Sequence, residues 1–146
     1  MNQIFIKQIG QIVMRVENIK FKAKRLDGKG WVCGYFYEEN GNTYIIDNRQ
    51  KESKLNRNIT YQVDPSTVCQ FTGLKDCKGR EVWEGDILQD VDDYNIKYVV
   101  TFNEGTFLAR KEGLYIGIPL HECVGSLGND VITYAKVVGN KFDKEK

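Results

Sequence analysis

The sequence predicts a small protein that is mainly β, with α+β as the alternative class. Aromatic residues make up 12% of the 146-residue chain, which has 14 glycines but only two prolines. Short apolar runs alternate with clusters of glycine, asparagine and aspartate, and aromatic runs favour strands while these residues favour turns. The length suits one domain, and 41% hydrophobic with 28% charged residues is an ordinary globular balance.

The first half predicts a β-hairpin followed by further strands. Apolar and cationic residues alternate over 19–24, as in a half-buried strand, and residues 27–30 supply the turn to an aromatic strand. Residues 47–58 carry no periodic pattern, so we expect a loop there. The strands predicted in this half are 19–24, 31–37, 43–46, 59–63 and 68–71.

The second half predicts five short strands with tight turns between them, such as Asn103-Glu104-Gly105. A connector at 119–126 precedes the last strand and has room for one helical turn. This pattern predicts an SH3-like small barrel or roll over residues 84–140, inside a domain of 19–146 that follows an N-terminal extension of 1–18. The five strands are expected at 87–91, 96–102, 106–110, 114–118 and 131–138.

Residues 71–88, FTGLKDCKGREVWEGDIL, form the segment most like a motif. Its glycines lack the G-x4-G-K-[ST] spacing of a phosphate loop, so we interpret them as turn residues. Asp76 to Gly79 is typical of a hairpin turn, with Asp at the first position and Gly at the last. Trp83 is expected in the core, and Gly85-Asp86 is expected to lead into a strand.

Together with its surroundings, this segment resembles the YopX family of phage and prophage proteins. The resemblance rests on Val63-Asp64-Pro65, the T-G-L-K-D and E-G-D-I blocks, Lys22-Ala23-Lys24 and Trp31 to Tyr35, and covers about residues 19–143. It implies a mainly β fold with an SH3-like roll, homo-oligomeric assembly and no catalytic residues. Its structural motif residues are Gly73, Leu74, Asp76, Gly79, Trp83, Glu84, Gly85, Asp86, Ile87, Gly139 and Asn140.

No constellation of catalytic or metal-binding residues stands out, so we expect neither an enzyme nor a cofactor. A metal-dependent hydrolase would need Glu81, Glu84, Asp86 and His121. A zinc site would need Cys69, Cys77, His121 and Cys123, but their spacing lacks paired knuckles. The non-catalytic interpretation is that the acidic residues form a solvated loop, the cysteines lie in the core and the histidine has no catalytic partner.

One basic stripe is a candidate for binding single-stranded nucleic acid. Lys20, Lys22, Lys24 and Arg25 line the first strand, and aromatic residues lie in the same hairpin. Phe21 is expected to point to the opposite face, into the core. The alternative is a solvated face, or one that pairs with the acidic residues 81–93 of another subunit.

The charge distribution favours self-association over a field that attracts nucleic acid. Residues 1–26 have six cationic residues and one acidic residue, residues 81–93 have six acidic residues and no cation, and the whole chain has a net charge of +1. These patches are complementary and suit head-to-tail assembly. We therefore expect a cytoplasmic, homo-oligomeric accessory protein with a host or phage protein partner, without membrane association, since no apolar run could span a bilayer.

Overall fold

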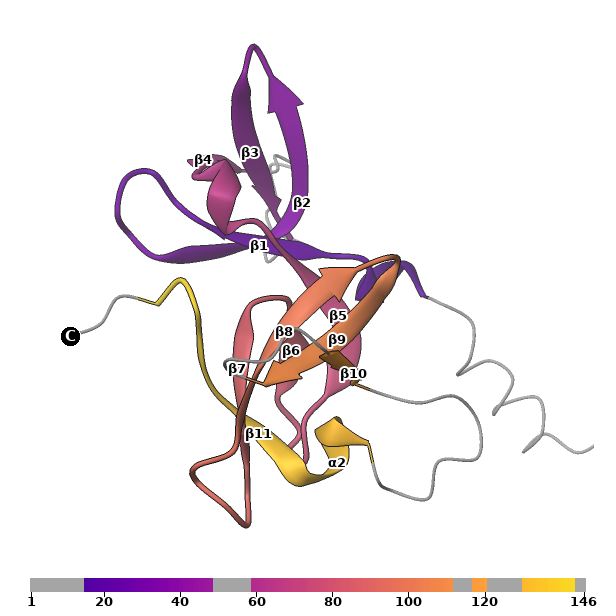
Figure 1. Ribbon diagram of the computed structural model, residues 1–146. Coiled ribbons are helices and arrows are strands. Elements are labelled where there is room, and N and C mark those ends of the chain that lie inside the picture. The colour runs from indigo at the N-terminus through magenta and orange to yellow at the C-terminus, as the bar shows by residue number, and fades with distance from the viewer. Residues whose placement is uncertain (1–14, 49–58, 112–116, 121–129, 144–146) are drawn as a thin grey trace, which may run out of the picture.

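The computed structural model describes residues 15–48, 59–111, 117–120 and 130–143. The protein is mainly β, as predicted, and its strands form two antiparallel sheets of six and five strands. Figure 1 shows the strands β1 to β4 of the first sheet above the second sheet, with a long hairpin projecting upward, while β5 and β6 lie beside the second sheet. The short 3₁₀ turn η1 (Val16–Asn18) leads into the first strand.

The six-stranded sheet has the order β4-β3-β2-β1-β5-β6. Its hairpins arise where expected, with turns between β1 and β2 and between β2 and β3, and a 3₁₀ turn η2 (Pro65–Thr67) between β4 and β5. The Asp64 side chain caps η2 by accepting from the amide of Ser66. The strands are β1 (Phe21–Lys24), β2 (Trp31–Glu39), β3 (Asn42–Asp47), β4 (Thr60–Val63), β5 (Cys69–Lys75) and β6 (Glu81–Trp83).

The first four strands curl until the end of β1 meets the end of β4. Arg25 forms an isolated antiparallel bridge with Val63, and two backbone hydrogen bonds of 2.9 and 3.0 Å flank the bridge. Phe21 packs on the inner side of this curl, opposite the lysines, as its alternation with them predicts. The buried side chains inside the curl are Ala23, Val32, Ile45 and Val63.

The five-stranded sheet has the order β10-β9-β8-β7-β11. Its strands are β7 (Asp86–Asp90), β8 (Lys97–Asn103), β9 (Thr106–Lys111), β10 (Gly117–Pro119) and β11 (Ala135–Asn140), and the helical turn α2 (Val131–Tyr134) comes directly before β11. The number of strands matches the expected five. Among the described residues, β10 and β11 do not pair with each other, so no closed barrel forms and the SH3-like roll stays a prediction.

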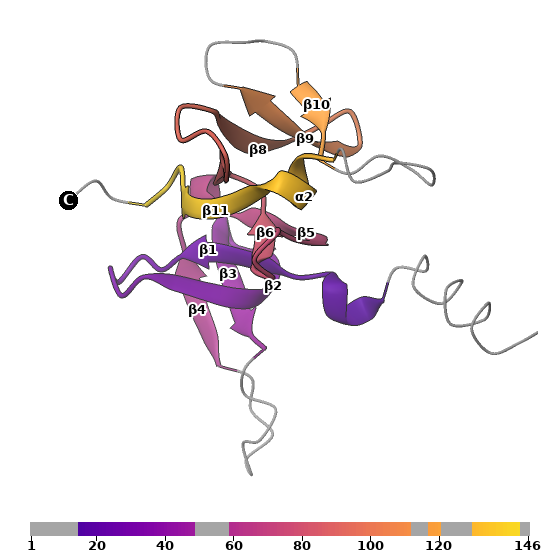
Figure 2. The ribbon, with the colours of Figure 1, turned by 90° about the horizontal axis from the view of Figure 1, so that it is seen from below.

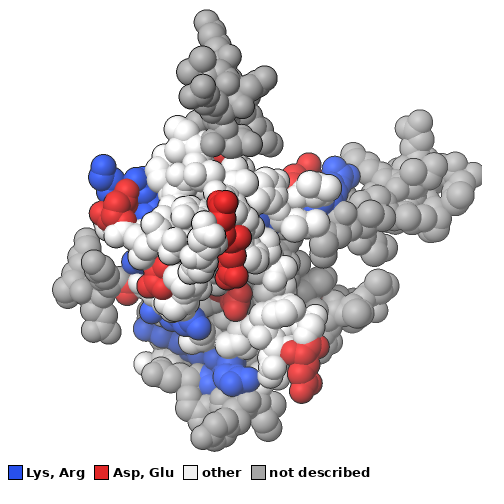
Figure 3. Space-filling view, turned by 90° about the horizontal axis from the view of Figure 1, so that it is seen from above, with Lys and Arg blue, Asp and Glu red and all other residues white. Residues whose placement is uncertain are grey.

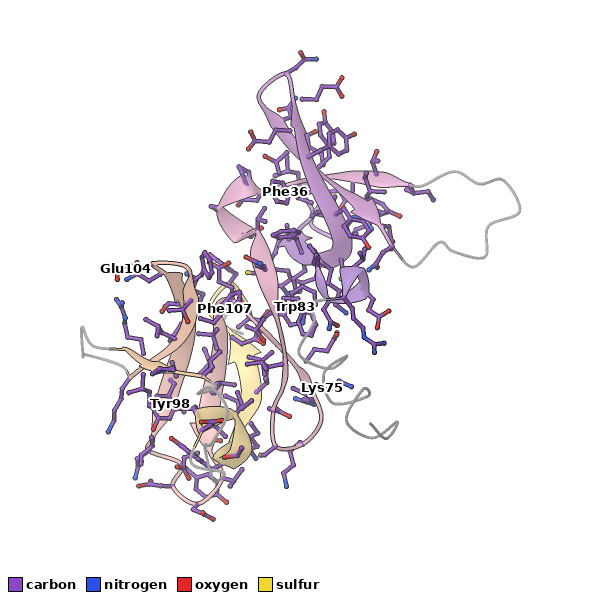
Figure 4. All side chains as sticks on the ribbon, turned by 90° about the vertical axis from the view of Figure 1, so that its right-hand side faces the viewer. Phe36, Lys75, Trp83, Tyr98, Glu104 and Phe107 are labelled. Carbon is purple, nitrogen blue, oxygen red and sulfur yellow. The ribbon has the colours of Figure 1, made fainter. Side chains whose placement is uncertain are left out.

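β6 joins the two sheets because its alternate side chains enter different cores. Val82 belongs to the core of the five-stranded sheet, with Leu88, Val100 and Ala135. Trp83 points the other way and lies where the two sheets meet in Figure 4. Seen from below, β11 lies between the strands β8 to β10 and the first sheet (Figure 2). The cleft between the sheets therefore has β1, β6 and β11 as its walls.

Two details of the second half differ from expectation. β6 is a strand, although its three residues belong to the segment 81–93 that is interpreted as an acidic loop. The helical turn lies at 131–134, inside the predicted final strand. The first follows from pairing with β5, where Phe71 faces Trp83. Most of the loop predicted at 47–58, the expected strand start at 114–116 and most of the connector at 119–126 lie outside the described residues.

Candidate functional site

A cleft between the two sheets is the best candidate site in the described part of the chain. It is a pocket of about 350 Å³ with both tryptophans in its wall, Trp31 from β2 and Trp83 from β6. Both aromatic rings lie close to the lysines of β1. Its other lining residues are Lys22, Arg80, Glu81, Asp86, Val137, Val138, Gly139, Asn140 and Asp143.

The lysines of β1 share the face of the sheet that looks into this cleft. The Lys22 amine lies 4.7 Å from the centre of the Trp31 ring and 5.1 Å from that of Trp83, and the Lys24 amine lies 5.4 Å from the centre of the Trp31 ring. The Lys20 amine lies 4.7 Å from the ring centre of Phe71. These distances are within the range of cation–π attraction. The basic stripe is thus packed on aromatic rings.

Three of the four cations predicted to bind nucleic acid form ion pairs inside the chain. The Lys20 amine lies 2.5 Å from a Glu81 carboxylate oxygen, and the Lys22 amine lies 3.9 Å from one of Asp86. Arg25 pairs with Asp27 in the turn after β1. The charge pattern predicts pairing between this stripe and the acidic segment 81–93, but across two subunits. The structure places both partners of the first two pairs in one chain.

Asp86 anchors the floor of the cleft. It is 2% exposed, and its carboxylate accepts from the amide of Trp83 at 2.8 Å and from the side-chain amide of Asn140 at 3.0 Å. Burial raises the pKa of Asp86 above its ordinary value of 3.8, although these hydrogen bonds and Lys22 oppose the shift. Gly85, with a φ of +84°, donates to Val100 O and accepts from the amide of Lys141, both at 2.8 Å.

The turn at the end of β11 attaches the second sheet to the first. The Trp31 indole N–H donates to Asp143 Oδ1 at 3.1 Å, while Asp143 Oδ2 accepts from the amide of Asn140 at 2.9 Å. Asn140 also accepts from the amide of Phe142 through its side-chain oxygen at 2.9 Å. The motif residues Gly85, Asp86 and Asn140 thus meet at one junction.

Asp76 performs a second clamping role at the β5–β6 turn. One carboxylate oxygen accepts from the amides of Lys78 and Arg80, and the other accepts from the amide of Val137 in β11, all at 2.8 Å. Gly79 has a φ of +83°, which confirms the expected turn. The hairpin turn is therefore fixed onto the edge strand of the other sheet, where it covers backbone groups that would otherwise be open to pairing.

A second pocket, about 440 Å³ in volume, lies over this clamp. Its described lining residues are Lys78, Arg80, Lys136, Val137 and Val138, with no carboxylate among them. Local sequence patterns could not predict this cationic pocket, because its cations come from segments more than 50 residues apart. The one available signal was the basic character of the turn KDCKGR, residues 75–80.

Both cysteines of the first-sheet strands are at least partly buried. Cys69 is fully buried, and burial raises its pKa to about 11. Burial also raises the pKa of Cys33. Cys77 is exposed on the β5–β6 turn. Within the described residues, no group of three or more His, Cys, Asp or Glu could hold a metal; His121 and Cys123 lie outside them.

Fold and cleft together define a small, mainly β protein with two antiparallel sheets joined by buried aspartates. The family described as YopX protein matches residues 10–145, which is nearly the whole chain. The chain therefore belongs to the YopX family, and the match begins before residue 19, where the sequence resemblance started. No curated protein matches the chain. Within the described residues, no helix is both long and apolar enough to cross a membrane.

Proposed function

We propose that this protein is a cytoplasmic phage or prophage accessory protein that acts without catalysis, by binding, and that it self-associates through its β2–β3 hairpin. Membership of the YopX family supports the phage origin, and an SH3-like roll in residues 84–140 is part of the same proposal. A host or phage protein would be the further partner. The observation that carries self-association is an open strand edge with exposed aromatic residues.

The carboxylates considered for a hydrolase are engaged in holding the fold. Glu81 pairs with Lys20, and Asp86 accepts two hydrogen bonds in the floor of the cleft. Glu84 accepts from the amide of Gln70 at 3.2 Å. Acid–base catalysis needs carboxylates that can reach a substrate, so these contacts favour a binding protein over the hydrolase alternative.

The distal half of β2 has only one neighbouring strand among those described. β1 pairs with residues 31–34 of β2, whereas residues 35–39 pair with β3 alone. Tyr35 and Phe36 on this segment are 41% and 43% exposed. The hairpin stands clear of the rest of the molecule in Figure 1, and acidic side chains run across the middle of the face viewed from above it in Figure 3. An open edge of this kind is a template for another strand.

A second copy of the same segment is the partner that best fits this edge. Antiparallel pairing of residues 35–39 about a twofold axis at Tyr37 places Glu39 opposite Tyr35 and Glu38 opposite Phe36 of the other copy. No acidic residue then faces another acidic residue, which would be unfavourable. A twofold interface of this type is self-complementary and closed, so a dimer is the expected unit.

This mode differs in a measurable way from head-to-tail assembly through charged patches. Lys20 and Lys22 already pair with Glu81 and Asp86 inside the chain, which leaves less charge for contacts between subunits. The same pairs weaken the proposal that strand 20–25 binds single-stranded nucleic acid. Strand pairing predicts a dimer that persists at high salt, whereas charge pairing predicts one that dissociates.

Multi-angle light scattering with Tyr37→Lys tests the hairpin interface. Two lysines would meet at the twofold axis, so we expect the variant to be monomeric at concentrations where the original protein is dimeric. Phe102→Lys is the matched control, because Phe102 forms a cross-strand aromatic pair with Phe107 at 4.9 Å, as Tyr37 does with Tyr44 at 5.1 Å. A monomer in the original protein, or equal effects of the two variants, would reject this interface.

A further inference from the structure

The two pockets beside β11 adjoin each other, and together they are called the β11 groove, whose two ends differ in chemistry. Both are lined by Arg80, Val137 and Val138. One end adds Lys78 and Lys136, and the other adds Lys22, two tryptophans and the carboxylates of β6, β7 and the turn after β11. None of the residues 35–39 of the projecting hairpin lines the groove, so the groove goes beyond the proposed interface.

The backbone segments that carry the cations are fixed by hydrogen bonds within the chain. Asp76 accepts from the amides of Lys78, Arg80 and Val137, so one carboxylate ties together the segments that carry all three cations. The Arg80 guanidinium donates to Val137 O at 3.3 Å and keeps further donors free. Neither Lys78 nor Lys136 forms an ion pair with a described residue. Three cations on segments that Asp76 ties together, in a pocket lined by no carboxylate, suit an oxyanion such as phosphate.

The aromatic end suits a flat ring that carries an amino group. Trp83 is buried, but Trp31 is half-buried and offers part of its ring beside the Lys22 and Lys24 amines. Stacking on such a ring is favourable for any nucleobase. Glu81 and Asp143 line the same pocket, and carboxylates accept hydrogen bonds but cannot donate them. An exocyclic amino group can therefore donate to either carboxylate at this end.

We propose that this groove binds a nucleotide unit, with its phosphate at Lys78, Arg80 and Lys136 and an amino-bearing base beside Trp31. The chemistry is shared by a free nucleoside monophosphate and by one unit of a single strand. Cytosine fits the carboxylate-lined end, whereas uracil presents a carbonyl where cytosine has its amino group. The groove therefore distinguishes ligands of the same shape and charge by the direction of one hydrogen bond.

NMR titration with cytidine 5′-monophosphate, uridine 5′-monophosphate and inorganic phosphate tests this site. The cytidine nucleotide should shift the Trp31 indole N–H signal and the amide signals of residues 78–80 and 136–138. Inorganic phosphate should shift only the amide signals. We expect uridine monophosphate to bind about fivefold more weakly than the cytidine nucleotide, because one hydrogen bond is lost and carboxylates face its carbonyl.

Charge-removing variants locate the phosphate. Arg80→Gln and Lys136→Gln should each weaken binding of the cytidine nucleotide about tenfold. Lys111→Gln, an exposed cation on β9, should leave it unchanged. Lys136→Gln keeps the test valid if Arg80→Gln disturbs the turn, because none of the described hydrogen bonds of the Asp76 clamp uses the Lys136 side chain.

An oligocytidylate distinguishes the two sources of the nucleotide. Tighter, salt-dependent binding than the mononucleotide identifies a strand, and equal binding per site identifies a free nucleotide; both results support the site. The inference is overturned if no ligand binds at millimolar concentration or if all three small ligands bind equally. It is also overturned if Lys111→Gln weakens binding as much as Lys136→Gln.

Discussion

Replacing Asp76 with alanine should destabilise the protein more than any other single change in the β5–β6 turn. The carboxylate is 6% exposed and accepts from three backbone amides at 2.8 Å. Loss of the bond to the half-buried Val137 amide should cost about 2 kcal/mol, and loss of the bonds to the exposed Lys78 and Arg80 amides about 0.5–1 kcal/mol each. The expected total is about 3–4 kcal/mol, or a melting temperature lower by roughly 10 °C.

Urea unfolding followed by tryptophan fluorescence measures this loss. Asp64→Ala is the matched control, because Asp64 caps the short η2 turn with bonds to the Ser66 amide and hydroxyl and should cost only about 1 kcal/mol. Asp76→Asn should fall between the two, since it keeps one acceptor. A loss for Asp76→Ala no greater than that for Asp64→Ala would refute the proposal that this carboxylate joins the sheets.

Two further predictions concern the junction at Asp86. Because burial raises its folded-state pKa above 3.8, the stabilising contribution of this group is full below that value and is lost as the pH rises through the folded pKa. The unfolding free energy of the original protein relative to Asp86→Asn should therefore fall as the pH rises above about 4, and a rise would contradict the assignment. In chemical denaturation, Gly85→Ala should lower the unfolding free energy by about 1 kcal/mol more than Gly79→Ala. Both glycines have positive φ, but only at position 85 would the added methyl group lie 3.2 Å from the side-chain amide nitrogen of Asn140. Equal losses would show that this contact relaxes freely.

Local patterns predicted the strands well because each pattern is read within a few residues. The apolar–cationic alternation over 19–24 gave β1 and the side of Phe21 correctly. Gly79 and Gly85 were expected in turns, and both have positive φ. These features depend on backbone conformation and on the two-residue period of a strand, which the neighbouring residues largely determine.

The candidate site was less predictable because long-range pairing builds it. Asp76 and Val137 are 61 residues apart, and their contact coincides with a shift of register in β11 between Val137 and Gly139. Lys20 and Glu81 are equally far apart, so their pairing within one chain could not be told from pairing between subunits. β6 was missed because a three-residue strand is too short to show a period.

The bond between Trp31 and Asp143 also bears on how the molecule folds. It joins residues 112 positions apart, whereas the hairpins β2–β3 and β8–β9 join neighbours in the sequence. Closing so long a loop is entropically costly, so the hairpins should form early and this junction late. Contacts absent from the transition state govern how fast a protein unfolds rather than how fast it folds. We therefore expect loss of the Trp31–Asp143 bond to raise the unfolding rate while leaving the folding rate nearly unchanged.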